Sequence, residues 1–121
     1  MEDALFATAI ALLLTHEMDA VRHREWRILP GLSRIRDDDT AYVWFTAVHV
    51  PLYVALLLAL FAGDAPNATA ARWLDGFLVV HAGLHLALYR LPENRFRGAF
   101  SYALILGAGL CGGAHLVAIT V

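Results

Sequence analysis

The stretch LLLTHEMDAVRHREWRILP, residues 12–30, passes from an unbroken apolar run into histidines and carboxylates. Its first polar side chains are His16, Glu17, Asp19 and His23. The apolar run begins near residue 4, and about 20 predominantly apolar residues suffice for a helix to cross a bilayer. The stretch therefore predicts a transmembrane helix over residues 4–22, with polar groups at a depth where each of them needs a partner.

The composition of the whole chain agrees with this prediction. Hydrophobic residues make up 60% of the 121 residues, charged residues make up 17%, and the mean hydropathy is +0.60. Soluble domains average about 25% charged residues, so this balance is typical of a membrane protein. We expect an all-α fold, an integral membrane four-helix bundle that forms a single domain over residues 1–121. Its expected spans are residues 4–22, 40–62, 72–90 and 97–120.

Turn-forming and charged stretches separate these spans. The acidic triplet Asp37–Asp39 suits the N-terminus of the second helix, where negative charge is stabilised. The stretch GDAPNATA, residues 63–70, has the Gly, Pro and Asn of a turn, and Pro92 and Asn94 mark the next break. The net charge of -2 and the absence of a basic patch argue against a nucleic-acid partner.

The distribution of arginine predicts the orientation in the membrane. The connection between the first two expected spans carries five arginines: Arg22, Arg24, Arg27, Arg34 and Arg36. The connection between the last two carries Arg90, Arg95 and Arg97, and the connection between the second and third carries only Arg72. Because basic loops stay on the cytoplasmic side, we expect a multi-pass protein of the inner (plasma) membrane with both termini on the non-cytoplasmic side.

Four histidines on three expected helices share one depth. At about 1.5 Å of rise per residue from the nearest cytoplasmic charge, His85 and His16 lie about 8 and 9 Å deep, and His81 and His49 about 14 and 15 Å deep. His81 and His85 also have the i, i+4 spacing that lets two imidazoles bind one ion. His115 lies about 27 Å from Arg97, toward the other face, and we expect it to make a helix–helix hydrogen bond instead.

The first helix offers two carboxylates beside this layer. Steps of 100° per residue place Asp19 on the stripe of His16 and His23, and Glu17 on a flank about 160° away. We therefore expect Asp19 to face the ion, and Glu17 to act as a base, as a proton relay or as the partner of an arginine. The predicted metal ligands are His16, Asp19, His49, His81 and His85. Imidazoles with a carboxylate suit Zn, Fe or Cu, and the single Cys111 offers no thiolate set.

Other polar and glycine residues have simpler interpretations. Each histidine alone is explained by an interhelical hydrogen bond, and His23, Glu25 and Trp26 are expected at the membrane interface among arginines and headgroups. Gly109 and Gly113 in the fourth segment have GxxxG spacing. They predict close helix packing, either inside the bundle or in a homo-oligomer or larger membrane complex.

The run THEMDAVRHREWRILP resembles a group of short bacterial four-span membrane proteins of unassigned function, which carry an HE-x-DA signature followed by EWR. His16-x-x-Asp19-Ala20 is more distantly similar to the HxxEE motif of another uncharacterised membrane family, with Asp and Ala in place of its glutamates. The histidine set is chemically similar to seven-span hydrolases of the ceramidase and adiponectin-receptor type, which bind zinc through three histidines beside an aspartate. The first resemblance covers most of the chain and implies a four-span fold without supplying an activity, whereas the likeness to the seven-span hydrolases is chemical and implies no fold.

The leading functional hypothesis is a metal-dependent membrane hydrolase or oxidase. Its catalytic carboxylates would be Glu17 and Asp19, and its substrate would be a lipid-like or apolar molecule reached from the membrane lipids around it. Two alternatives remain. In one, His49 with His81 or His85 ligates haem b for electron transfer, and in the other the chain is an accessory subunit of a larger membrane complex.

Overall fold

The computed structural model describes residues 2–63 and 67–121, which form four long α-helices and no strand. The long helices are α1 (Glu2–His23), α2 (Asp38–Phe61), α3 (Ala68–Ala87) and α4 (Ala99–Ala118). Short 3-10 helices occupy the loops: η1 (Glu25–Arg27), η2 (Leu32–Arg34) and η3 (Leu88–Arg90). The predicted all-α class is confirmed.

Side-chain caps explain where two helices begin. Asp37 precedes α2, and its carboxylate accepts a hydrogen bond from the backbone N–H of Thr40 at 2.8 Å. Asn67 caps α3 by accepting from the backbone N–H groups of Thr69 and Ala70. This cap starts α3 at Ala68, four residues before the sequence-based boundary. Residues 64–66 of the expected turn lie outside the described part of the chain.

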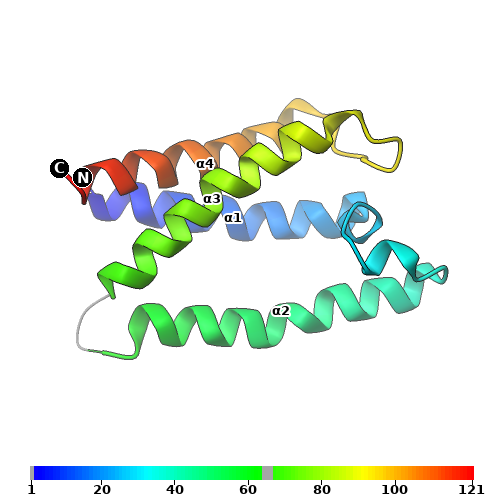
Figure 1. Cartoon of the computed structure of the whole chain (residues 1–121), viewed down its shortest axis with the longest axis horizontal. Helices are drawn as coiled ribbons and strands as arrows, with labels where there is room; N and C mark the ends of the chain where they lie inside the picture. The colour runs from blue at the N-terminus through cyan, green and yellow to red at the C-terminus, as the bar shows by residue number, and fades with distance from the viewer. Residues whose placement is uncertain (1, 64–66) are drawn as a thin grey trace.

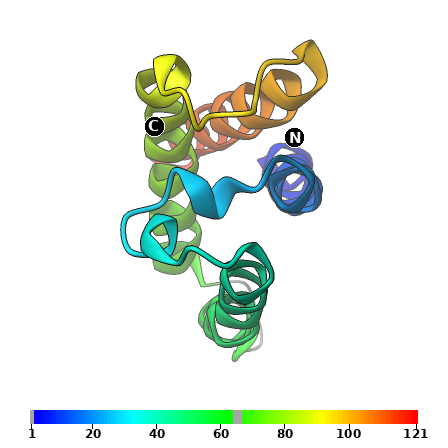
Figure 2. The same cartoon turned by 90° about the vertical axis from the view of Figure 1, so that its right-hand side faces the viewer.

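The helices form an up-and-down arrangement in which α4 packs against α1 and α3, while α2 makes few contacts with the other three helices (Figure 1). Both termini lie at one end of the molecule, and η1, η2 and the α3–α4 loop lie at the other end. The end-on view in Figure 2 shows α2 set apart from the group of α1, α3 and α4. The two loops richest in arginine thus share one end.

Glycines let α3 and α4 approach closely. A Cβ at Gly109 would lie 2.7 Å from the Cβ of Ala82, and a Cβ at Gly112 would lie 3.0 Å from Cδ1 of Leu78. Both distances are shorter than a comfortable carbon–carbon contact. At Gly113 a Cβ would meet Val79 at an ordinary 3.4 Å. The small residues of α4 therefore serve packing inside the bundle, with Gly112 in closer contact with α3 than the expected Gly113.

Three helices, α1, α2 and α4, are long and apolar enough to cross a membrane. Large apolar side chains such as Val50, Leu58 and Leu110 are exposed on the outside of the bundle, as lipid contact favours. α3 carries Arg72 and Asp75 in its N-terminal half and is not among these three. A fourth span at α3 stays a prediction.

Candidate metal centre

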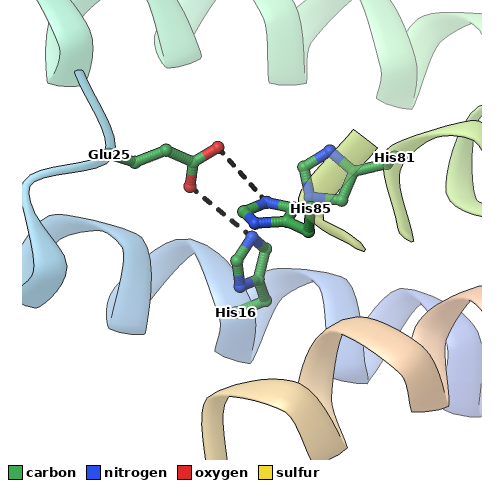
Figure 3. A group of neighbouring side chains, drawn as sticks. All are labelled: His16, Glu25, His81 and His85. Atoms are coloured by element: carbon green, nitrogen blue, oxygen red, sulfur yellow. Dashed lines mark ion pairs between the residues drawn. The ribbon is translucent and has the colours of Figure 1, made fainter. Parts of the chain in front are cut away.

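Three histidines and one glutamate converge where α1, α3 and η1 meet. His16 comes from α1, His81 and His85 from successive turns of α3, and Glu25 from η1. One possible ligand atom from each residue lies within 4.8 Å of the other three. Figure 3 shows the four side chains pointing toward one another, with the carboxylate facing the imidazole rings. We call these four residues the His3Glu cluster.

A sharp turn after α1 brings Glu25 to the cluster. Arg24 has a φ of 55°, a left-handed conformation uncommon outside glycine, and it ends the helix and reverses the chain. The next residues hold η1 against α2: Trp26 Nε1 donates to Asp38 Oδ1 at 2.9 Å, and Arg27 Nε donates to the same oxygen at 2.8 Å. Glu25 is thereby directed away from water and into the bundle.

Three members of the cluster are buried, His81 is partly exposed, and the rings pack edge to face. His16 is 1% exposed, His85 is 3% exposed and Glu25 is 7% exposed. The ring centroid of His85 lies 4.9 Å from that of His16 and 4.6 Å from that of His81. Phe96, fully buried, covers the group with its ring 4.9 Å from His85 and 5.5 Å from His16. This packing keeps bulk water from the polar atoms.

Several of these buried polar atoms have no hydrogen-bond partner among the described residues. They are His16 Nδ1 and Nε2, His81 Nε2, His85 Nδ1 and Glu25 Oε2. Two of them, His16 Nε2 and Glu25 Oε2, face each other at 3.5 Å without a hydrogen bond. Leaving a buried polar atom unsatisfied costs about 1–3 kcal/mol, so the group is costly without a ligand. A cation bound among them would satisfy nitrogen lone pairs and carboxylate oxygen together.

The contacts of Glu25 favour its charged form. Burial raises the pKa of this carboxyl, but the contact with His85, together with the neighbouring rings of His16 and His81, outweighs burial and brings the pKa below its ordinary value. Glu25 Oε1 lies 3.6 Å from His85 Nε2, and Oε2 lies 3.5 Å from His16 Nε2. A carboxylate with both oxygens turned to imidazoles is a suitable anionic ligand.

The structure brings together three of the five expected metal ligands, His16, His81 and His85. Asp19 is not part of this group and contacts the i, i+4 neighbour on its own helix, with its Oδ1 3.2 Å from His23 Nδ1. His49 also lies apart, since α2 stands away from the bundle, and its Nε2 is 3.0 Å from Glu17 Oε2. Glu17 is thus paired with an expected ligand.

Glu25 was expected at the interface and is instead the carboxylate of the cluster. Helical periodicity could not place it, because α1 ends between His16 and Glu25. One signal was present in the sequence: Glu25 is the only acidic residue among the arginines that surround Trp26.

A second buried pair lies at the opposite end of the bundle. His115 Nδ1 on α4 is 2.7 Å from Asp75 Oδ2 on α3, and Asp75 is fully buried. The helix–helix hydrogen bond expected for His115 is therefore confirmed. Its partner Asp75, which composition alone did not single out, is the fourth acidic residue found beside a histidine, after Glu25, Asp19 and Glu17.

Comparisons with known proteins supply a family and no activity. No curated protein and no solved structure matches the chain. One protein family matches residues 2–121, which includes all four helices and every residue of the His3Glu cluster. The chain belongs to this family, a family of unknown function (DUF6713).

Proposed function

We propose that this protein is a membrane protein that binds one transition-metal ion through His16, Glu25, His81 and His85. The observation that carries the proposal is the set of unpartnered nitrogen and oxygen atoms facing one another in a buried site. If these histidines served only as interhelical hydrogen-bonding groups, their buried nitrogen atoms would have hydrogen-bond partners. The atoms of the cluster named above have none among the described residues.

The donor set limits the metal. Three imidazole nitrogens and one carboxylate oxygen suit Zn, Fe or Cu, whereas Mg and Ca prefer oxygen ligands alone. Cys111 on α4 is not part of the cluster, so no thiolate contributes. Among these ions, zinc is the one most often held by four such ligands in tetrahedral geometry.

We also propose that the bound ion catalyses a reaction on an apolar substrate. If the ion kept one coordination position open beside these ligands, it would act as a Lewis acid that activates water for hydrolysis or, as iron, would support oxidation of a hydrocarbon. Glu17 follows His16 directly in α1 and faces a cavity between the helices, so we assign proton transfer to Glu17. Asp19, also expected to be catalytic, holds His23.

We propose the same membrane orientation that the arginines predict. The His3Glu cluster lies toward the end of the bundle that carries η1 and the α3–α4 loop. With both termini outside, the centre would lie near the cytoplasmic side of the inner membrane, within reach of lipids of that leaflet.

Two alternatives fit the contacts less well. A haem held by His49 and an α3 histidine is disfavoured because His49 Nε2 contacts Glu17 instead of facing His81 or His85. An accessory subunit of a larger complex accounts for the exposed side of α2, but it gives no reason for the unpartnered atoms of the cluster.

Elemental analysis and an absorption spectrum of the protein, purified in detergent without chelators, test the proposal. We expect close to one metal per chain. His81→Gln and His85→Gln should each lower metal content at least about tenfold, because even residues that only orient ligands cost about 10–100-fold in affinity. His49→Gln, the matched control on α2, should keep its metal. A Soret band would support the haem alternative. Protein that takes up no added metal would overturn the proposal.

A further inference from the structure

A large apolar cavity, partly open to the outside of the bundle, separates α2 from α1 and α3. Its volume is about 590 Å³, and its walls include Leu13, Leu56, Leu74 and Phe77. Small-molecule sites in proteins span about 300–1,000 Å³ and are lined mostly by apolar groups, so this cavity is of ligand size. It follows from the position of α2, which stands apart from the other helices (Figure 2).

A second cavity of about 280 Å³ adjoins the first. Glu17 and Tyr53 line both, and Val21, Phe45 and Thr46 line the smaller one, nearer the loop that carries η1. The two spaces form a passage along α1 and α2 with its polar groups near the middle. The larger cavity continues from there toward Asn67 and Trp73, at the other end of the bundle.

The polar side chains where the two cavities meet include the pair Glu17–His49. His49 Nδ1 donates to the backbone oxygen of Phe45 at 2.6 Å, so its Nε2 is the nitrogen that faces Glu17 Oε2, at 3.0 Å. This contact fixes one carboxyl oxygen. The other oxygen of Glu17 makes no hydrogen bond to the described residues and remains available to accept one.

Hydrocarbon is the occupant that such walls favour. A trapped water needs two to four polar partners, and most of the residues that line the larger cavity are apolar, the exceptions being Glu17, Tyr53, Asn67, Thr69 and Trp73. At the far end, the side-chain oxygen of Asn67 is already used in capping α3. An acyl chain satisfies the apolar walls, and a donor group on it would meet Glu17.

We infer that this cavity binds the hydrocarbon chain of a single-chain lipid whose head carries a hydroxyl or an amide N–H that donates to Glu17. A free carboxylate is disfavoured as the head group because it would face the carboxyl of Glu17. The ring of Phe77 lines the cavity and lies 5.3 Å from the ring of His81, so one wall of the cavity borders the His3Glu cluster.

The bound lipid would be the substrate of the proposed function. Lipid binding does not depend on the metal, and only the reaction rests on the proposed function. Binding itself involves no residue of the His3Glu cluster, so the cavity and the metal can be tested separately. Two measurements on the same samples, lipid labelling and metal content, distinguish the failure of one from the failure of the other.

Photolabelling tests the cavity. The probes are a long-chain alcohol with a diazirine at the end of its chain and the fatty acid of equal length, each added to detergent-purified protein, with labelled peptides identified by mass spectrometry. We expect the alcohol to label the cavity walls around Leu56 and Leu74, and the acid to label them at least about tenfold less, equivalent to about 1.4 kcal/mol.

Substitutions on α2 provide matched controls. Ala55 and Ala59 line the larger cavity, while Ala47 on the same helix is exposed and lines neither cavity. Ala55→Trp and Ala59→Trp should each reduce labelling by the alcohol at least about tenfold, and Ala47→Trp should leave it unchanged. Ala55→Trp and Ala59→Trp should both keep the metal content of the parent protein. Equal labelling in all three Trp variants, or by both probes, would overturn the inference, whatever the metal content.

Discussion

Glu25 Oε2 lies 3.5 Å from His16 Nε2, although α1 ends between the two residues. The other oxygen of Glu25 lies 3.6 Å from His85 on α3, so one carboxylate joins a loop to two helices (Figure 3). The His3Glu cluster therefore depends on the turn at Arg24 as much as on the helices that carry its histidines.

Replacing the carboxylate tests the role of Glu25 as a metal ligand. Glu25→Gln keeps the size of the side chain and removes its charge, so metal content should fall at least about tenfold as measured by elemental analysis. Glu17→Gln is the matched control on α1, because Glu17 pairs with His49 and lies outside the cluster. Retention of metal by Glu25→Gln together with loss by Glu17→Gln would show that the ligand set is wrong.

The buried pair Asp75–His115 should stabilise the far end of the bundle. Asp75→Leu leaves His115 Nδ1 buried without its partner, and we expect the free energy of unfolding to fall by about 1–3 kcal/mol, seen as a lower melting temperature in detergent. Metal content per folded chain should not change, since neither residue belongs to the His3Glu cluster.

A double replacement separates the pair from packing. In Asp75→Leu/His115→Phe, the new ring keeps the contact that His115 makes with Phe6 at a centroid distance of 4.8 Å. Because well-packed apolar pairs often replace buried ion pairs without loss, most of the lost stability should return. A double variant less stable than Asp75→Leu would contradict this account.

Close contact between α3 and α4 predicts opposite effects at two glycines. Gly109→Ala places a Cβ 2.7 Å from that of Ala82 and should lower stability by about 1–3 kcal/mol in a thermal melt. Gly83→Ala meets nothing within 4 Å and should be neutral or stabilising, since Ala favours helix over Gly by about 1 kcal/mol. Equal effects at the two positions would argue against the close approach of the helices.

Single cysteines test the membrane orientation. Arg34 and Arg95 are both exposed in loops at the end of the bundle opposite the termini (Figure 1). In a Cys111→Ser background, Arg34→Cys and Arg95→Cys should react with a membrane-impermeant thiol reagent only from the cytoplasmic side. Reaction of the two positions from opposite sides would contradict a four-span topology, and reaction of both from outside would reverse the orientation.

The sequence alone was enough for the helices and for the histidines of the site. Apolar length and turn residues predicted four helical segments, and the acidic triplet marked the start of α2 because a carboxylate can cap helix N–H groups. The i, i+4 spacing of His81 and His85 and the depth of His16 depend only on helix geometry. Such local properties do not require knowledge of the packing.

The tertiary structure decided which carboxylate joins those histidines. Asp19 shares a helical stripe with His16, yet its side chain meets His23, while Glu25 returns to the site through a left-handed turn that no periodicity describes. The separation of α2 from the bundle likewise removed His49 from the site and paired it with Glu17. Depth along a helix is fixed by a constant rise per residue, whereas lateral position depends on how helices and loops pack, and only the folded chain determines that.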